Sequence, residues 1–344
     1  MVALVAVAAA LPAQTTVAVP CAADNTLYQA ALGDLSNGAG VGVFVGLNSA
    51  GLIRRGLVRF DVAAAVPAGA QVLAARLDVN VSNSPVAVAE PFFGHRVLAA
   101  WGEGTSVASG GGGNGGPAAA NDATWLFRFY PGSLWSSAGG DFASAPSFTA
   151  TMPALGAFAS VLSVAAAADV QSWLDQPATN FGWLLKGAET TLQSTHRLDS
   201  RESTGLRPVL TVTYLLPGQN GTWGIGCPTG VGAFTAAWSG APIGGTTTAI
   251  QHSRAPASSL GADFFTLRLD PLGINLLPGC TVWLPGNELV VGGAFATGPG
   301  GTASIPFVVP SGFPGYLIVC QSAVLTNTNA LGFIVSNAAV TVLQ

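Results

Sequence analysis

The stretch Arg54-Arg-Gly-Leu-Val-Arg-Phe-Asp-Val62 has the pattern of a β-strand. Its side chains alternate with a period of two, so Leu57 and Arg59 would lie on one face and the apolar residues at 58, 60 and 62 on the other. This alternation is typical of a strand that buries one of its faces. Most segments before residue 217 alternate in the same way, and together they predict an all-β fold.

The arginines of this strand are its unusual feature. The chain has eleven arginines, nine of them before residue 217, and three of those nine are Arg54, Arg55 and Arg59. Charged residues make up only 8% of the chain. Two hypotheses follow from this concentration of cations. Either the strand forms the floor of a ligand-binding face, or its arginines are structural and pair with acidic residues of neighbouring strands.

The composition limits the classes to which the protein can belong. The 344 residues include 45 glycines and 22 prolines, which is typical of many short strands joined by tight turns. The net charge is −4, there is a single lysine, Lys186, and no basic run is present. The chain therefore lacks the cations that neutralise a phosphate backbone, and we expect no nucleic-acid partner.

The distribution of charges and turn residues predicts two domains. Residues 1–216 hold 13 of the 16 acidic and 10 of the 12 basic residues. The strongest linker signal, Pro217-Gly218 with Asn220-Gly221, follows this charged part. We therefore predict two jelly-roll-like β-sandwich domains at 14–217 and 218–344, each long enough to bury a core.

Two segments of the first domain depart from the strand pattern. In Ala165 to Gln176, apolar residues recur at helical spacing and Pro177 follows, which predicts a short helix at one end of the sandwich. The glycine run Ser109 to Pro117 predicts a mobile loop without regular structure. The other predicted strands are 17–29, 41–47, 71–81, 92–101, 148–152, 157–164, 181–186, 195–202, 208–216, 234–238, 246–252, 264–269, 281–284, 302–309, 315–321 and 331–343.

The beginning of the chain predicts secretion. Residues 1–13 are apolar or small and resemble the apolar region and cleavage zone of a secretory signal, without its positively charged start. An apolar first strand is the alternative. Neither this segment nor any later apolar run is long enough to span a membrane. We therefore expect a secreted protein, extracellular or on the cell surface, that does not span the membrane.

The four cysteines are compatible with secretion, and their spacing has no metal-ligand pattern. Cys227 and Cys280 each follow a glycine near a turn of the second domain, and we predict a disulfide between them. Cys21 and Cys320 could pair with each other or stay as buried thiols.

Short phrases between residues 24 and 202 resemble a known family. They are Asp24-Asn-Thr-Leu-Tyr-Gln29, Arg55-Gly-Leu-Val-Arg-Phe-Asp61, Trp101-Gly-Glu-Gly-Thr-Ser106, Asp122-Ala-Thr-Trp125, Asp169-Val-Gln-Ser-Trp173, Asn180-Phe-Gly-Trp-Leu-Leu185 and Asp199-Ser-Arg-Glu202. In this order and spacing they resemble the DNRLRE-type domain, a secreted β-sandwich classed with carbohydrate-binding modules. The resemblance implies polysaccharide binding, with acidic polymers such as alginate among the ligands of relatives, although many members look like surface or scaffolding modules.

The second domain resembles a different module. Its phrases are Gly226-Cys-Pro228, Pro271-Leu-Gly273, Pro278-Gly-Cys280 and Asn329 to Asn337. They are similar to a C-terminal β module of secreted proteins from planctomycete-like and related bacteria. The resemblance implies a structural or surface-associated role and no established chemistry.

The candidate ligand-binding residues combine rings and cations. Sugars have apolar C–H faces that stack on planar rings and polar edges that accept bidentate donors, and the arginine fork suits carboxylated sugars. Of the candidates, Arg54 and Arg55 at the strand entrance are the expected contacts. In the structural alternative the tryptophans belong to the core, while Arg59 and Arg201 pair with Asp61, Asp199 or Glu202. The candidates are Arg54, Arg55, Trp101, Trp125, Arg197 and Arg201.

Other chemistry has weaker support in the sequence. A structural calcium ion would take oxygens from Asp24, Asn25, Glu103 and Asp122, although no calcium-loop pattern is present. No serine lies in a nucleophile elbow, and the histidines at 95, 196 and 252 belong to no metalloprotease motif. Glu103 and Asp122 could form the carboxylate pair of a glycosidase.

We therefore predict a secreted, non-catalytic polysaccharide-binding protein for acidic, uronate-containing glycans. The alternative is a structural cell-surface or matrix protein with protein partners, favoured by the low charge and the high content of alanine, glycine and threonine. A polysaccharide hydrolase or lyase is the third hypothesis. Affinity for an anionic polysaccharide that falls with salt would separate the first from the second.

Overall fold

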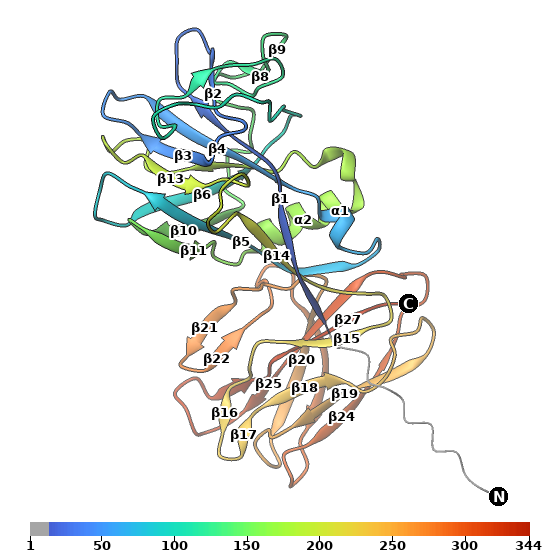
Figure 1. The fold of residues 1–344 in the computed structure, drawn as a ribbon. Helices are drawn as coiled ribbons and strands as arrows, with labels where there is room; N and C mark the ends of the chain where they lie inside the picture. Colours follow the sequence, from blue (N-terminus) through green and yellow to red (C-terminus); the bar gives the residue numbers. More distant parts are fainter. Residues whose placement is uncertain (1–13) are drawn as a thin grey trace, which may run out of the picture. The chain divides into compact units, whose positions relative to one another are not determined.

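The computed structural model describes residues 14–344 (Figure 1). They form an N-terminal unit, Val17–Ala68 with Ala74–Val212, and a C-terminal unit, Gly69–Leu73 with Thr213–Gln344 and residues 14–16. The division is not a single cut at the predicted linker, because the short segment at 69–73 belongs to the C-terminal unit. The predicted secretion signal at 1–13 lies outside the described residues.

Both units are built of β-strands, which confirms the predicted all-β fold. Within residues 14–344 the α-helices are α1 (Val62–Ala65) and α2 (Val164–Asp175), and a 3-10 turn, η1 (Pro177–Thr179), follows α2. The helix α2 is the one that the sequence predicts. The helix α1 is not predicted by the sequence pattern; it lies beside α2 (Figure 1), and the strand that precedes it ends at Phe60.

The helix α2 begins with a side-chain cap and packs through its aromatic face. The hydroxyl of Ser163 accepts the backbone N–H of Ala166 at 3.0 Å, which satisfies a donor at the start of the helix. The ring of Trp173 lies 4.8 Å from that of Trp183. Asp169 accepts the indole N–H of Trp183 at 2.8 Å, and burial raises the pKa of its carboxyl group.

The strands of the N-terminal unit follow one hydrogen-bonded path. Its order is β1-β14-β5-β13-β3-β4-β12-β6-β10, with β11 paired to β5. Because β1 also pairs with β4, the part of the path from β1 to β4 closes into a ring. The bounds are β1 (Thr15–Tyr28), β2 (Leu35–Ser36), β3 (Gly42–Leu47), β4 (Ile53–Phe60), β5 (Gln71–Asn83), β6 (Glu90–Arg96), β7 (Gly116–Pro117), β8 (Phe127–Phe129), β9 (Ser133–Leu134), β10 (Phe148–Met152), β11 (Gly156–Ala159), β12 (Trp183–Lys186), β13 (His196–Asp199) and β14 (Val209–Leu215).

Strand β4 is buried on both faces rather than on one. Phe60 packs against Trp183 on one face, with 6.3 Å between the ring centroids. Leu57, on the opposite face, belongs to a second buried cluster with Leu184 of β12. The alternation of the sequence is therefore real, but its arginine-bearing face is covered as well.

The C-terminal unit has two main sheets and two small hairpins. One sheet has the order β15-β27-β25-β20-β23, with β26 paired to β25, and the other has the order β18-β19-β24. The hairpins are β16-β17 and β21-β22. The bounds are β15 (Asn220–Trp223), β16 (Pro228–Thr229), β17 (Gly232–Ala233), β18 (Thr235–Trp238), β19 (Thr247–Ser253), β20 (Leu260–Thr266), β21 (Ile274–Leu277), β22 (Cys280–Val282), β23 (Val290–Ala296), β24 (Ala303–Val308), β25 (Leu317–Leu325), β26 (Phe333–Val335) and β27 (Ala338–Val342).

The cysteines have two different roles. Cys227 and Cys280 form a disulfide with 2.12 Å between the sulfur atoms, which confirms the predicted pair. They lie in a buried cluster with Phe234. Cys21 and Cys320 are free and buried, and burial raises the pKa of both thiols well above its usual range.

Candidate functional site

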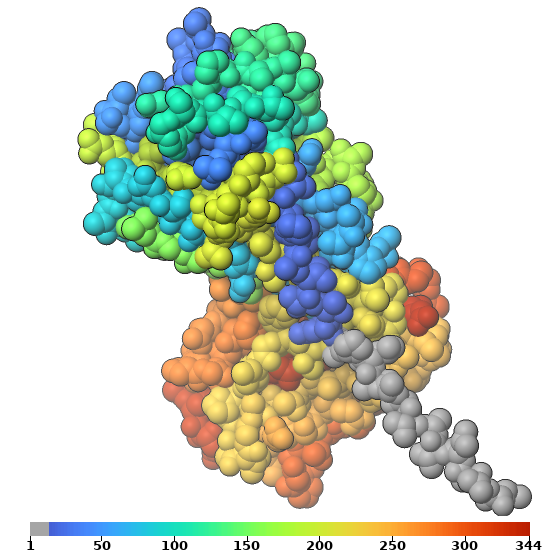
Figure 2. Space-filling view, in the orientation of Figure 1, coloured from blue at the N-terminus to red at the C-terminus, as the bar shows by residue number. Residues whose placement is uncertain are grey.

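A long segment between β6 and β10 covers the arginine-bearing face of β4. We call residues 97–142 the covering segment; Figure 2 shows it in teal and green beside the blue surface of the first strands. Its Trp101 and Trp125 share a buried cluster with Leu57. Only 4% of Trp101 and 8% of Trp125 is exposed, so both belong to the core, as the structural alternative expects. Neither ring is available as a stacking platform for a sugar.

Arg55 fastens the covering segment to the sheet. Its Nε and Nη2 atoms donate to the carboxylate of Glu189 at 2.8 and 3.0 Å, and Nη1 donates to the carbonyl oxygen of Gly139 at 2.8 Å. Its Cζ atom lies 5.0 Å from the ring centroid of Trp125. A bidentate pair of this kind is among the stronger charge-assisted contacts in proteins. The guanidinium is therefore occupied within the chain.

Arg54 is on the opposite face of β4 and is only 2% exposed. Its Cζ atom lies 5.0 Å from the ring centroid of Tyr28, and its Nε donates to the carbonyl oxygen of Gly113 at 3.2 Å. Burial lowers the pKa of this guanidinium. The structure thus places Arg54 and Arg55, which the sequence predicts as ligand contacts, among partners of their own unit that enclose both side chains.

Contacts of the same kind hold the glycine run at 109–117 against the sheet. The Tyr28 hydroxyl donates to the carbonyl oxygen of Gly112 at 2.8 Å, next to the Gly113 carbonyl that Arg54 holds. The run ends in β7, which pairs with β2. The glycines at 110, 111, 112 and 115 have positive φ, which explains the glycine-rich sequence. The predicted loop is therefore tied to β1 and β4 at its centre.

Three acidic residues and one arginine from distant parts of the chain meet in what we call the acidic cluster. Arg201 donates to Glu103 from Nε at 2.5 Å and from Nη2 at 2.8 Å, and its Nε lies 3.0 Å from Glu202 Oε1. The backbone N–H of Arg201 donates to Asp24 Oδ2 at 2.6 Å. The cluster therefore joins β1, the covering segment and the turn after β13. The contact with Glu202 is one of the structural pairs that the sequence suggests for Arg201.

The electrostatics of this cluster are set by burial. Burial raises the pKa of Asp24 to about 8, and the charges of Glu202 and Glu103 act in the same direction. Burial also raises the pKa of Glu202. Among residues 14–344, Asp24 Oδ1 and Glu202 Oε2 are buried without a hydrogen-bond partner. A carboxylate oxygen in that position is stabilised by a proton or by a cation.

Of the four predicted calcium ligands, Asp24 and Glu103 lie in this cluster, whereas Asn25 and Asp122 do not. The Asp122 carboxylate accepts the backbone N–H groups of Ala119 at 2.7 Å and Thr105 at 2.9 Å. The Asn25 side chain donates to the Ser36 hydroxyl at 2.9 Å and to two backbone carbonyls. Both side chains are used to hold loops, because their oxygens and nitrogens are satisfied locally. The predicted set is corrected to Asp24, Glu103 and Glu202, the acidic groups that the structure places within reach of one point.

This corrected set does not fit a calcium ion. Calcium takes about six to eight oxygen ligands. Both oxygens of Glu103 accept hydrogen bonds from Arg201, and Oε1 of Glu202 forms an ion pair with it, which leaves Asp24 Oδ1 and Glu202 Oε2. The Arg201 guanidinium occupies the place of a metal cation, and we derive no metal-dependent step from this cluster.

Three arginines contact the four residues 100–103 of the covering segment. Arg128 donates from Nη1 to the carbonyl oxygen of Ala100 at 3.3 Å. The Cζ atom of Arg59 lies 5.8 Å from the ring centroid of Trp101, and Arg201 pairs with Glu103. Four residues of chain span at most about 14 Å. All three guanidinium groups therefore contact the same short part of the covering segment, and we call this set of arginines the arginine surface.

Arg201 is paired with Glu103 and Glu202, and Arg128 acts electrostatically on Asp141 from beyond ion-pair distance, so the other two arginines of this surface are its less closely paired cations. Arg59 and Arg128 are partly exposed, and no carboxylate of residues 14–344 lies within 4.0 Å of either of them. The Cζ atom of Arg128 lies 5.4 Å from the ring centroid of Phe129, which is also partly exposed. Arg128 is not predicted as a site residue, because nothing in its local sequence distinguishes it from a solvated arginine.

Arg197, the remaining candidate, lies on β13. Its Nη2 donates to the carbonyl oxygen of Val41 at 3.3 Å, and its Nε is buried without a partner among residues 14–344. None of its described contacts involves another candidate residue. The structure therefore leaves Arg197 outside the arginine surface.

The C-terminal unit contains a buried polar group that the sequence does not reveal. His252 Nε2 lies 2.9 Å from both Asp263 Oδ1 and Ser322 Oγ, and the serine hydroxyl donates to the same aspartate oxygen at 2.6 Å. In a catalytic triad the serine and the aspartate use different nitrogens of the histidine ring. Here they share one nitrogen and Nδ1 has no partner, so this arrangement is not that of a triad.

Comparisons with known proteins add no family. No protein-family model matches the chain, and no curated protein is significantly similar to it. The helices among residues 14–344 lack the length and apolar character that a membrane crossing requires. The resemblance to the DNRLRE-type domain therefore stays a proposal based on the phrases alone.

Proposed function

We propose that the chain is a secreted, non-catalytic polysaccharide-binding protein whose N-terminal unit binds acidic, uronate-containing glycans at the arginine surface. The observation that carries this proposal is the environment of Arg59 and Arg128. Both cations are partly exposed and have no carboxylate of residues 14–344 within 4.0 Å, and Arg128 lies against the ring of Phe129.

The chemistry of this surface suits a uronate. The carboxylate of the sugar would accept bidentate donors from an arginine, and the C–H face of the ring would pack on an exposed aromatic edge. Arg201 is held by Glu103 and Glu202, so it fixes the covering segment rather than supplying free donors. The resemblance of the N-terminal phrases to the DNRLRE-type domain supports the same class of ligand.

The experiment is a binding titration of the full chain with alginate and with a neutral glucan. We expect alginate to bind more tightly, with an affinity that falls as salt rises, because exposed charges are screened. Arg128→Ala should weaken alginate binding about fivefold or more, as expected for loss of one charge-assisted contact. The matched control is Arg76→Ala, which removes an arginine with 48% of its side chain exposed and paired to Asp78 at 3.0 Å.

Equal binding by wild type and Arg128→Ala would reject the arginine surface as the site. Absence of binding to both polymers by a folded wild type would reject polysaccharide binding itself. The structural cell-surface alternative would then be preferred.

A further inference from the structure

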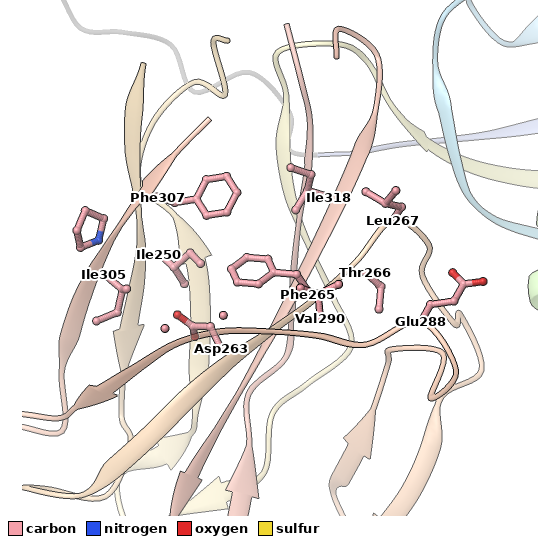
Figure 3. Close-up of a pocket in the computed structure, with 13 residues that line it drawn as sticks. Ile250, Asp263, Phe265, Thr266, Leu267, Glu288, Val290, Ile305, Phe307 and Ile318 are labelled. Atoms are coloured by element: carbon pink, nitrogen blue, oxygen red, sulfur yellow. The ribbon is translucent and has the colours of Figure 1, made fainter. Parts of the chain in front are cut away.

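The C-terminal unit contains a cavity of about 700 Å³ (Figure 3). Its walls are apolar and come from both sheets: Ile250 and Phe307 belong to one sheet, and Phe265 and Ile318 belong to the other. Figure 3 shows these side chains gathered around the same space. The volume lies within the range of small-molecule sites, about 300–1,000 Å³.

The sequence of the edge strands explains why this space is not filled. Gly292 and Gly293 of β23 line the cavity and contribute no side chain. A Cβ atom on Gly292 would lie 2.4 Å from Cε2 of Phe265, so no side chain fits there unless that ring moves. On β24, Pro306 lines the same cavity and has no N–H group to donate. The two edge strands therefore leave the sandwich open between them.

A buried carboxylate lies at one end of the cavity. Asp263 is 1% exposed, and its Oδ1 accepts both Ser322 and His252. Its other oxygen, Oδ2, has no hydrogen-bond partner among residues 14–344. Figure 3 shows Asp263 beside Ile250, at the end opposite to Glu288. Glu288 is neutralised by Arg268 at 2.6 Å, whereas Asp263 has no arginine or lysine partner.

His252 and Ser322 both occupy Oδ1 of this carboxylate. The Nδ1 atom of His252 is buried without a partner among residues 14–344, so the ring contacts the aspartate through Nε2 alone. Oδ2 therefore presents an unpaired acceptor to an otherwise apolar space.

We propose that this cavity binds an amphiphilic amine, with a hydrocarbon body against Phe265, Phe307 and Ile318 and an ammonium group on Asp263 Oδ2. The apolar walls stabilise the body by removing it from water. The ammonium would donate a charge-assisted hydrogen bond to Oδ2, which receives no donor from the described part of the chain. A fatty acid would place a second carboxylate beside Asp263, and a plain hydrocarbon would leave Oδ2 unpaired. This site is separate from the arginine surface and does not depend on glycan binding.

The test uses three probes of equal length, octylamine, 1-octanol and octanoate, titrated calorimetrically into the full chain. We expect octylamine to bind at least about tenfold more tightly than octanol, since a charged hydrogen bond contributes about 1.5–3 kcal/mol. Octanoate should bind most weakly. Asp263→Asn should remove the preference for the amine and keep the affinity for octanol.

A second pair of variants keeps the test independent of the buried aspartate. Val290 lines the cavity and is 63% exposed, whereas its neighbour Val291 is 67% exposed and does not line it. Val290→Arg should weaken octylamine binding about tenfold or more by charge repulsion and obstruction, and the matched Val291→Arg should leave it unchanged.

Two results would overturn the proposal. One is equal affinity of wild type for the three probes, or no binding of any of them. The other is a change of oligomeric state in Val290→Arg, but not in Val291→Arg, together with no binding of any probe. This result would show that a second copy of the chain closes the gap between the edge strands.

Discussion

The two units of this protein use their polar groups in opposite ways. In the N-terminal unit, charged side chains fasten segments to each other: Arg55 binds Glu189, and Arg201 binds Glu103 and Glu202. The C-terminal unit has few charges and holds its segments mainly by apolar packing and the Cys227–Cys280 disulfide, with an ion pair between Arg268 and Glu288. In a chain with so little charge, an arginine therefore marks a place where the fold is fastened more often than a place where a ligand binds.

The difference has a structural origin. The covering segment contains only short strands, β7 to β9, so few of its backbone groups are held in a regular ladder. It needs side-chain contacts to stay on β4, and arginine reaches both backbone carbonyls and carboxylates. The C-terminal sheets are held by their own ladders, and their interior can stay partly open. The ion pairs of the N-terminal unit therefore follow from a segment with little regular structure. The partly open core of the C-terminal unit follows from sheets that are held by their own hydrogen bonds.

The largest effect should come from removing the fastening arginine of β4. Arg55→Met leaves Glu189 without its bidentate partner and removes the contact with Trp125. Losing one partner of a largely buried pair costs about 3–5 kcal/mol, and we expect a loss at the lower end because Lys186 lies 3.4 Å from the same carboxylate. The free energy of unfolding in urea measures it.

The exposed pair Arg76–Asp78 is the control for this comparison. Arg76→Met should change the free energy of unfolding by less than about 1 kcal/mol, because exposed pairs contribute little. If the two variants are equally stable, Arg55 does not fasten the covering segment, and the contrast between the units is lost.

The second effect should be confined to the C-terminal unit. Cys227 and Cys280 are 53 residues apart, and breaking such a crosslink typically costs about 2–4 kcal/mol. The double variant Cys227→Ala/Cys280→Ala should therefore lower one calorimetric unfolding transition and leave the other in place. Equal shifts of all transitions would show that the two units do not unfold as separate bodies.

Local patterns predicted a good part of this fold. The alternation at β4, the helix α2 and the disulfide were all visible in short stretches, because each depends on neighbouring residues or on turn positions. The partners of the charged residues were not visible. Arg55 and Glu189 are 134 residues apart, and Glu103 and Arg201 are 98 apart, so only the tertiary fold brings them together.

The surroundings of the arginines could not be predicted for a related reason. Arginines on an alternating strand suggest an exposed polar face, yet a guanidinium can also lie over an aromatic ring. The Cζ atoms of Arg59 and Arg55 lie 5.8 and 5.0 Å from the ring centroids of Trp101 and Trp125. The buried group of His252, Asp263 and Ser322 could not be foreseen either, since its members come from three strands and no spacing connects them.

The smallest predicted effect, taken for each pH unit, is a pH dependence that belongs to the N-terminal unit. The pKa of Asp24 rises from its usual 3.8 to about 8 on folding. Between these values the folded chain keeps a proton that the unfolded chain releases, so the free energy of unfolding falls as pH rises from about 4 to 8. One proton accounts for at most about 1.4 kcal/mol for each pH unit. The raised pKa of Glu202 acts in the same direction.

The variant Asp24→Asn isolates this contribution, since the amide keeps the shape of the protonated carboxyl and cannot ionise. Urea unfolding at pH 5, 6 and 7 should give a shallower decrease for the variant than for wild type, with the two curves closest at pH 5. Parallel curves would mean that Asp24 is ionised in the folded chain throughout this range. Calcium provides a further check on the acidic cluster. If millimolar calcium stabilises wild type and not Asp24→Asn, the cluster binds a metal ion despite Arg201. The interpretation that the Arg201 guanidinium takes the place of a metal cation would then be wrong.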